Sequence, residues 1–227
     1  MKIFIKTWLN DLEWLGYCLR SINKFVTHDG VVIVCDNSAR LMLQSMETYG
    51  ADIQYVGDTV NGYITQQVFK LNAHTRIPDE HILFVDSDCV FTNPVSVLDY
   101  MSGGKPCWLK TKYGSLDGGE VWKAITEKAV GWPVAWEYMR QLPILVLRST
   151  LAGFQTQFPK LNTKLLRLTT RQFSEFNALG AYAEKFQEDQ YVFVDTDTSP
   201  PHTTVRQFWS WGGMTDEIRA EIEEVLA

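Results

Sequence analysis

The stretch Ile82-Leu83-Phe84-Val85-Asp86-Ser87-Asp88 decides the fold that the sequence predicts. Four consecutive apolar residues are typical of a short strand that is buried on both faces of a parallel sheet. This strand leads directly into two aspartates at i and i+2 spacing, so both carboxylates can converge on one cation. In open parallel sheets, ligands bind outside the carboxyl ends of the strands. The stretch therefore predicts a parallel sheet with an acidic binding site at its edge.

Strand and helix patterns alternate in the chain that leads to this stretch. Strands are expected at residues 2–7, 31–35 and 52–56, and helices at 11–22, 41–49 and 63–74. Such alternation indicates a mostly parallel central sheet flanked by helices, so we predict a Rossmann-like α/β fold. Thr7, Asp36 and Asp86 all stand at ends of predicted strands and are expected at one edge of the sheet.

The second half of the chain has shorter and less regular patterns. Strands are expected at residues 107–112, 144–148 and 191–194, and helices at 122–130, 134–140, 178–186 and 215–226. Neither an internal repeat nor a linker interrupts the sequence. We therefore predict a single domain that spans residues 1–227.

The overall composition argues against several classes of protein. Of the 227 residues, 45% are hydrophobic and 21% are charged, which is ordinary for a soluble globular domain. The formal net charge of -6 gives no global attraction to nucleic acid or anionic lipid. The four cysteines are widely spaced, which favours reduced thiols over disulfides or a zinc site. No apolar run reaches the roughly 20 residues that cross a bilayer, and residues 1–6 do not resemble a signal peptide, so we expect a cytoplasmic protein.

The two aspartates after the fourth strand point to a metal site. Mg²⁺ and Mn²⁺ prefer oxygen ligands, usually one or two carboxylates together with substrate phosphates and water. Asp86 and Asp88 therefore predict a site for Mn²⁺ or Mg²⁺. A cation there would neutralise the charge that builds up on a leaving diphosphate. An Asp-x-Asp pair also occurs by chance in solvated loops, but the buried strand that delivers this pair favours a function.

A polar stripe precedes this strand. Tyr63, Gln66, Gln67 and Lys70 have i, i+3, i+4 and i+7 spacing, so they share one face of the expected helix. The apolar residues among them imply that the helix is largely buried, which argues against a merely solvated face. We predict that Tyr63, Gln67 and Lys70 contact the sugar hydroxyls or the phosphates of a donor.

Short blocks along nearly the whole chain carry a family resemblance. They are Ile5-Lys6-Thr7, Asp11-Leu12-Glu13-Trp14-Leu15, the residues 62–71 and 82–88, Tyr138-Met139-Arg140-Gln141-Leu142-Pro143, Ser174-Glu175-Phe176-Asn177-Ala178-Leu179-Gly180 and Gln207-Phe208-Trp209-Ser210-Trp211-Gly212-Gly213. In this order they resemble GT-A-type glycosyltransferases, and more narrowly a poorly characterised bacterial and phage group of GT-A-like proteins (DUF6492-like). The resemblance implies a GT-A-like domain with a donor half at residues 1–100 and an acceptor half at residues 101–227.

The resemblance also implies roles for residues of the donor site. Asp36 would reach the base or ribose of a nucleotide-diphosphate-sugar, with a UDP-sugar as first candidate, and Thr7 would line the same pocket. Asp86 would lie near the ribose and the metal, and Asp88 would be the firmer metal ligand. GT-A enzymes often take a further metal ligand from a late histidine, and His202 is the only histidine in the second half of the chain.

Transfer with inversion at the anomeric carbon needs a base for the acceptor hydroxyl. Glu175 is the first candidate because it begins an expected helix directly after Ser174, where the helix dipole stabilises a negative charge. Ser-Glu at a helix start is also common capping chemistry. Asp189 is a second candidate and Glu137 a third, and the sequence leaves open both this choice and the choice between inverting and retaining chemistry.

The acceptor site is less well defined. Arg140, Asn177 and Trp211 are its candidates, since sugar rings stack on indoles and the other two side chains bind hydroxyls. The acceptor is expected to be a glycan or another hydroxyl compound. Modified bases of phage DNA stay open because basic residues recur at helical spacing in residues 160–171, although the acidic net charge disfavours duplex DNA.

The sequence therefore predicts a metal-dependent glycosyltransferase. A nucleotidyltransferase or a metal-dependent phosphohydrolase is an alternative, because these enzymes also use aspartate pairs at sheet edges. A non-catalytic sugar- or nucleotide-binding module is another, although the presence of both Asp86 and Asp88 argues against it.

Overall fold

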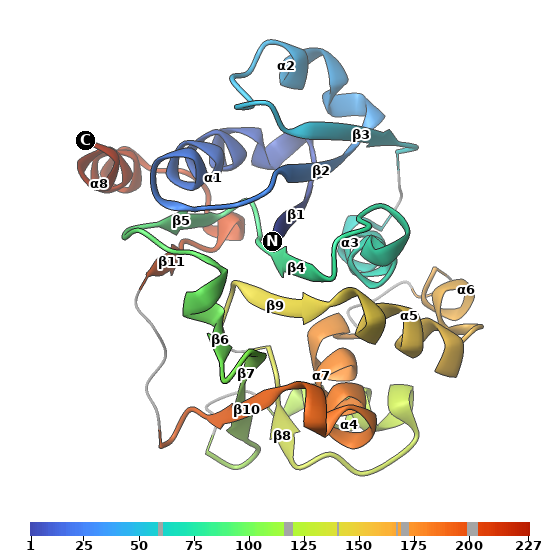
Figure 1. Ribbon diagram of the computed structural model, residues 1–227. Coiled ribbons are helices and arrows are strands. Elements are labelled where there is room, and N and C mark those ends of the chain that lie inside the picture. Colours follow the sequence, from blue (N-terminus) through green and yellow to red (C-terminus); the bar gives the residue numbers. More distant parts are fainter. Residues whose placement is uncertain (59–60, 116–119, 140, 167, 169–172, 199–203) are drawn as a thin grey trace.

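The computed structural model describes residues 1–58, 61–115, 120–139, 141–166, 168, 173–198 and 204–227. Its central sheet has the strand order β3-β2-β1-β4-β9 (Figure 1). The bounds are Lys2–Thr7 for β1, Val31–Asp36 for β2, Asp52–Val56 for β3, His81–Phe84 for β4 and Ile144–Leu147 for β9. The first four strands are parallel, and β9 runs antiparallel to β4. The predicted α/β fold with a mostly parallel sheet is confirmed.

Helices flank this sheet, and the strand order explains their sides. The chain moves from β1 to β2 to β3 in one direction and then returns past β1 to β4. Since such crossovers are right-handed, α1 (Leu12–Phe25) and α2 (Arg40–Gln44) cover one face and α3 (Gly62–Leu71) covers the other. In Figure 1, α1 and α3 accordingly lie on opposite sides of β1. The reversal of strand order between β1 and β4 creates the crevice in which such folds bind ligands.

The second half of the chain adds a smaller sheet and more helices. The smaller sheet has the order β10-β7-β6, with β8 also paired to β7. The bounds are Met101–Ser102 for β6, Lys105–Lys112 for β7, Trp136–Glu137 for β8, Val192–Asp195 for β10, Val121–Val130 for α4, Arg148–Gln157 for α5, Leu161–Leu165 for α6 and Glu175–Phe186 for α7. Helix α7 packs against α3, α4 and α5, and Phe176 in its first turn contacts the ring of Phe84 in β4.

A separate two-stranded sheet and a last helix complete the described chain. Strand β5 (Cys89–Phe91) follows the two aspartates and pairs antiparallel with β11 (Val205–Gln207). Short 3-10 segments follow β1 and β11, namely η1 (Leu9–Asp11) and η6 (Ser210–Gly212). Helix α8 (Asp216–Leu226) packs on α1. None of the helices in the described segments combines the length and the apolar character needed to span a membrane.

One predicted element is wrong. Residues 134–140 were expected to form a helix, but Trp136 and Glu137 form β8, which pairs with β7. Two tertiary contacts outweigh the local pattern. The indole of Trp136 covers the Lys110 ammonium at 4.2 Å, and the backbone N–H of Tyr138 donates to Asn177 Oδ1 at 2.7 Å. The helix expected at 41–49 is also shorter, because α2 ends at Gln44.

The packing of α7 leads to a testable prediction at Gly180. A Cβ at this position would lie 2.3 Å from Tyr138 Cγ and 2.4 Å from Tyr138 Cβ, which is far below van der Waals contact. We expect Gly180→Ala to reduce the free energy of unfolding by about 1–3 kcal/mol through overpacking. This loss occurs although alanine is the better helix former. Urea denaturation measures it.

Gly16→Ala is the matched control, because Gly16 also lies inside a helix, α1. Its added Cβ would meet only the flexible end of Met46, 3.6 Å away. This variant should match the parent or gain up to about 1 kcal/mol. Equal stability of the two variants would contradict the described packing of α7 on Tyr138.

Candidate functional site

A cavity of about 880 Å³ opens at the carboxyl ends of the parallel strands. Thr7 ends β1, Asp36 ends β2, and Asp86 follows β4, and all three side chains line this cavity. The structure thus brings together the strand-end residues that the sequence placed at one edge. Asp88, Glu175 and Trp211 line the same cavity.

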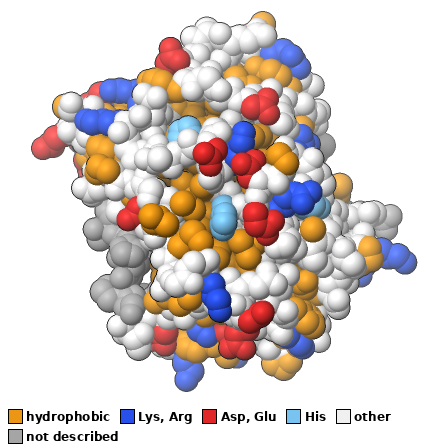
Figure 2. Space-filling view, viewed as in Figure 1, with side chains coloured by type: hydrophobic (Ala, Val, Ile, Leu, Met, Phe, Trp, Pro, Cys, Tyr) orange, Lys and Arg blue, Asp and Glu red, His pale blue; other side chains and the backbone are white. Residues whose placement is uncertain are grey.

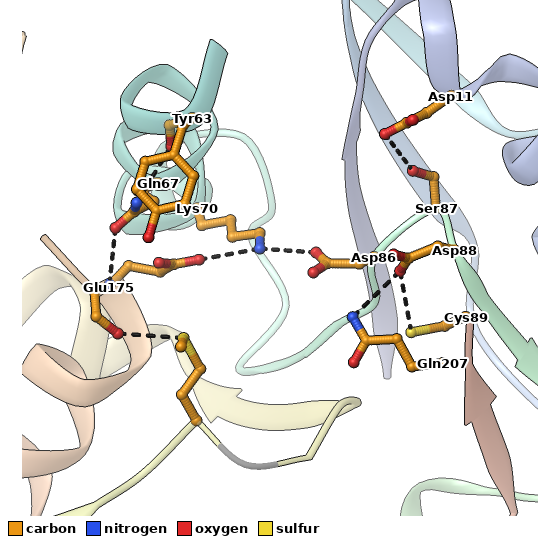
Figure 3. A network of polar contacts seen from close by, with 12 residues as sticks. Asp11, Tyr63, Gln67, Lys70, Asp86, Ser87, Asp88, Cys89, Glu175 and Gln207 are labelled. Carbon is orange, nitrogen blue, oxygen red and sulfur yellow. Dashed lines mark hydrogen bonds and ion pairs between the residues drawn. The ribbon is translucent and has the colours of Figure 1, made fainter. Parts of the chain in front are cut away.

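Lys70 lies at the centre of the site and joins its two sides (Figure 3). Its Nζ is 2.7 Å from Asp86 Oδ1 and 3.0 Å from Glu175 Oε1, and its side chain is almost wholly buried. Burial alone would lower the pKa of Lys70, but the charges and hydrogen bonds of Asp86 and Glu175 outweigh it and raise the pKa. The ammonium therefore stays charged at neutral pH and holds a carboxylate of the β4 edge against a carboxylate of α7.

Gln67 and Tyr63 brace α3 against the start of α7. Gln67 Oε1 accepts the backbone N–H of Glu175 at 3.1 Å, and Gln67 Nε2 donates to the carbonyl of Tyr63 at 3.2 Å. Tyr63 Oη donates to the carbonyl of Phe173 at 3.3 Å. Both residues line the cavity. Protein groups bind both the oxygen and the nitrogen of the Gln67 amide. Gln67 therefore positions the backbone of Glu175 in this structure.

Asp88 holds the segment that follows β11. Its Oδ2 accepts the backbone N–H of Ser210 at 2.9 Å, and its Oδ1 accepts Gln207 Nε2 at 3.3 Å. Its backbone carbonyl accepts the N–H of Phe208 at 3.0 Å. Burial and the neighbouring charge of Asp86 raise the pKa of Asp88 to about 6, although the bonds from Ser210 and Gln207 act in the opposite direction. The carboxylate pair therefore lies close enough for mutual repulsion, which a cation would relieve.

Asp11 is a further carboxylate of the site that the sequence reasoning missed. It ends η1, lines the cavity, and accepts a long hydrogen bond of 3.5 Å from Ser87 Oγ (Figure 3). Burial raises its pKa, while hydrogen bonds from Trp8, Ser210 and Ser87 lower it, and the charge of Asp86 adds to the rise. The sequence signal that could have identified Asp11 is its position four residues after the end of the first strand, near the same edge of the sheet.

The cavity also has hydrogen-bonding groups at the ends of β1 and β2. Lys6 Nζ donates to the carbonyl of Thr7 at 2.6 Å and to Asp36 Oδ1 at 2.8 Å. The hydroxyl of Thr7 is buried and has no hydrogen-bond partner among the residues that the structure describes. A buried hydroxyl without a partner is unfavourable unless a ligand or water satisfies it. Thr7 is therefore free to bind a ligand group.

Several candidates from the sequence do not lie in this cavity. Asn177 is fully buried, and its amide donates to Ser174 Oγ at 2.9 Å while accepting from the backbone of Tyr138, so it cannot reach an acceptor. Asp189 lies exposed in η5 (Glu188–Gln190), away from the cavity lining. Buried Glu137 is also not part of the lining. Arg140, His202 and part of the basic stripe at 160–171 lie outside the described residues.

The charges of the lining test whether a cation fits. Six carboxylates and three cationic groups line the cavity: Asp11, Glu13, Asp36, Asp86, Asp88 and Glu175, against Lys6, Lys70 and Arg219. Each cationic group is already paired to a carboxylate. A diphosphate would therefore enter an acidic cavity that has no unpaired cation among its described residues, unless it brings a counter-ion. The donor set fits a hard divalent cation, since carboxylate oxygens are its preferred ligands.

The same residues also limit how a cation can be held. Within the described ranges, no three side chains of His, Cys, Asp or Glu come close enough to form a metal site. Asp86 and Asp88 would therefore supply two ligands, and oxygens of a bound ligand and water would complete the shell. This is the arrangement expected of a cation that binds together with its substrate.

A family model described as a family of unknown function (DUF6492) matches residues 18–114. The matched segment contains Lys70 and both Asp86 and Asp88. No curated protein matches the chain.

Two solved structures have a similar fold. One is the galactosyltransferase LgtC in complex with donor and acceptor sugar analogs, with a TM-score of 0.56 and 11% identity over 100% of this chain and 95% of that chain. The other is 4-diphosphocytidyl-2C-methyl-D-erythritol synthase from Anaerococcus prevotii, with a TM-score of 0.55 and 12% identity over 99% of this chain and 97% of that chain. At such identities the likeness concerns the fold alone. The chain therefore has a GT-A-like, Rossmann-type fold.

Proposed function

We propose that this protein is a metal-dependent glycosyltransferase that moves a sugar from a nucleotide-diphosphate-sugar, with a UDP-sugar as first candidate, to a hydroxyl acceptor. One observation carries the proposal. Asp86 and Asp88 lie at the edge of the parallel sheet and share one cavity with the buried carboxylate of Glu175. Lys70 links the two sides through its bonds to Asp86 and Glu175. The cation-bound diphosphate and the base for the acceptor hydroxyl would thus face each other in the same cavity.

The donor site is assigned to residues at the ends of β1, β2 and β4. Asp86 and Asp88 would hold Mn²⁺ or Mg²⁺, which when bound neutralises the negative charge on the departing nucleoside diphosphate. Thr7 and Asp36, which end β1 and β2, offer a hydroxyl and a carboxylate to the nucleoside. Because β2, β1 and β4 are neighbours in the sheet, Asp36, Thr7 and Asp86 follow one another along its edge, which is consistent with an extended nucleotide bound outside the strands.

Glu175 is the group that we assign to the acceptor hydroxyl. Its Oε1 is occupied by Lys70, and among the described residues no hydrogen bond involves its Oε2. Since Lys70 binds only Oε1, Oε2 is available to accept the hydroxyl proton as the acceptor oxygen attacks the anomeric carbon. The backbone bond from Glu175 to Gln67 fixes where this oxygen lies.

A nucleotidyltransferase is the second candidate, because the synthase from Anaerococcus prevotii is as similar in fold as the galactosyltransferase. Both kinds of enzyme bind a nucleotide at the sheet edge but break different bonds. In this chain, β1 is followed by the bulky residues Trp8, Leu9 and Asn10, which lead into η1. A glycine-rich phosphate loop, which would favour nucleotidyl transfer, is not present at this position.

A donor screen tests the proposal. We expect the melting temperature to rise by several degrees with a matching UDP-, GDP- or TDP-sugar and Mn²⁺, since ligand at 100 times its Kd adds about 2.7 kcal/mol of stability. The rise should vanish when EDTA replaces Mn²⁺. A protein that no nucleotide sugar stabilises in a metal-dependent way is not a transferase of this type. Stabilisation without turnover would instead support a binding module.

A further inference from the structure

The exposed tryptophans of this protein all lie at one place. Trp8, Trp209 and Trp211 are 47%, 56% and 82% exposed, and all three line the cavity that contains Asp86 and Asp88. Trp8 lies beside η1, whereas Trp209 and Trp211 belong to the turn around η6. An exposed indole is unfavourable in water unless a ligand covers it. Their common position therefore indicates a ligand with flat, apolar faces.

Four of the other five tryptophans pack on rings or a cation of the protein, and the fifth, Trp122, is half-buried and also lines the cavity. Trp14 packs on Phe208, and Trp108 packs on Tyr191 and donates from Nε1 to the carbonyl of Tyr138. Trp132 packs on Phe158 and Phe186, and Trp136 covers Lys110. By contrast, none of the three exposed indoles contacts another aromatic ring among the described residues. Their faces are thus left open to a ligand.

The backbone of Trp209 gives an independent sign that this exposure is functional. Trp209 has φ 59°, a left-handed conformation that is rare for a bulky residue and costs about 1 kcal/mol or more. The bonds from Phe208 and Ser210 to Asp88 hold this conformation from both sides. A strained residue that presents its side chain to solvent beside a polar site is typical of ligand contact.

The charges of the cavity decide which flat ligand fits. Sugar rings and nucleobases both stack on indoles, but a strand of nucleic acid also needs cations for its phosphates. The cationic groups of the lining are paired: Lys6 with Asp36, Lys70 with Asp86 and Glu175, and Arg219 with Glu13 and Asp216. Away from the cavity, the face of the molecule shown in Figure 2 likewise has acidic and basic side chains interspersed without a continuous basic area, so that face offers no alternative site for a strand of nucleic acid. A neutral ligand is therefore favoured.

We propose that Trp209 and Trp211, with Trp8, form the binding platform for an uncharged oligosaccharide, which is the acceptor of the transferase. This inference rests on the proposed function and specifies its acceptor. The cavity volume of about 880 Å³ is near the upper end of the range for small-molecule sites, so it has room for acceptor sugars beside a donor. The platform shares its turn with Ser210, which Asp88 binds, so the acceptor lies next to the cation site.

Binding measurements on immobilised ligands test this platform. The ligands are a panel of neutral oligosaccharides built from glucose, galactose, mannose, xylose and N-acetylglucosamine, together with a thymidine decanucleotide, each with and without UDP and Mn²⁺. We expect at least one oligosaccharide to bind and the decanucleotide not to bind. Trp211→Ala and Trp209→Asn should each weaken oligosaccharide binding about tenfold, with UDP binding unchanged. Asparagine is chosen because it tolerates the left-handed backbone of position 209.

Leu41→Ala is the matched control, because Leu41 is 81% exposed and lies outside the cavity lining. It should bind oligosaccharide as the parent does, and all variants should melt within a few degrees of the parent. The proposal is overturned if no oligosaccharide binds, if only the decanucleotide binds, or if the tryptophan variants bind oligosaccharide normally. A loss of UDP binding in the tryptophan variants would also overturn the proposal, because the indoles would then bind the nucleoside rather than the acceptor. UDP binding by the parent protein is measured separately. If the parent does not bind UDP with Mn²⁺, the proposed function has failed, whatever the oligosaccharide result.

Discussion

Asp88→Asn should strongly weaken the Mn²⁺-dependent binding of nucleotide sugars while the protein stays folded. The substitution removes one of the two carboxylates that would hold the cation, and we expect affinity to fall by about 100-fold, or roughly 3 kcal/mol. The fold should persist because the asparagine oxygen can still accept the N–H of Ser210, and the Gln207 amide can rotate to accept from the new amide. Calorimetric titration with UDP and Mn²⁺ measures the loss.

Asp189→Asn is the control for this experiment. It makes the same chemical change at an exposed aspartate outside the cavity lining. This variant should bind UDP and Mn²⁺ as the parent does. If Asp88→Asn also binds them normally, Asp88 is not a ligand of the cation.

Lys70→Met should destabilise the protein by about 3–5 kcal/mol, the usual effect of breaking a buried ion pair. It leaves the carboxylates of Asp86 and Glu175 facing each other without the ammonium that now lies 2.7 Å and 3.0 Å from them. The melting temperature should fall by roughly 10 °C, since a protein of this size loses about 2–4 °C per kcal/mol. Urea denaturation gives the free energy directly.

The double variant Lys70→Met, Glu175→Gln separates this effect from lost packing. Removing the charge of Glu175 as well should recover part of the stability, so the two changes should couple by more than about 1 kcal/mol. Additive effects of the two single substitutions would contradict the bridge between α3 and α7. The double variant should remain inactive, because it lacks the assigned acceptor base.

The sequence predicted the main sheet well because buried parallel strands leave a strong local signal. Residues 31–35 and 82–85 are continuous apolar runs, and the structure places β2 and β4 there. The edge residues Thr7, Asp36 and Asp86 followed from the same signal, because parallel strands end at one edge. The polar stripe on α3 likewise placed Tyr63, Gln67 and Lys70 on the cavity side.

Contacts between distant parts of the chain could not be predicted in this way. Lys70 meets Glu175 across 105 residues of sequence, and Asp88 meets Ser210 across 122. No local pattern encodes such pairs, so the tasks of Gln67 and Asp88 within the protein were not foreseen. Asn177 was expected to bind an acceptor hydroxyl. It lies two residues after Glu175, about 200° around the helix, and so faces the core, where the backbone of Tyr138 and the hydroxyl of Ser174 bind its amide.

The central claim is that the protein transfers a sugar from a nucleotide-diphosphate-sugar. Identifying which bond of the donor is broken tests this claim most directly. Phosphorus NMR of a UDP-sugar, incubated with the protein, Mn²⁺ and a neutral oligosaccharide that binds, identifies that bond from its products. We expect UDP as the phosphorus product, formed only with Mn²⁺ and not by Asp88→Asn or Glu175→Gln. Release of UMP with a sugar phosphate would contradict it, because the diphosphate rather than the anomeric bond would then be cleaved.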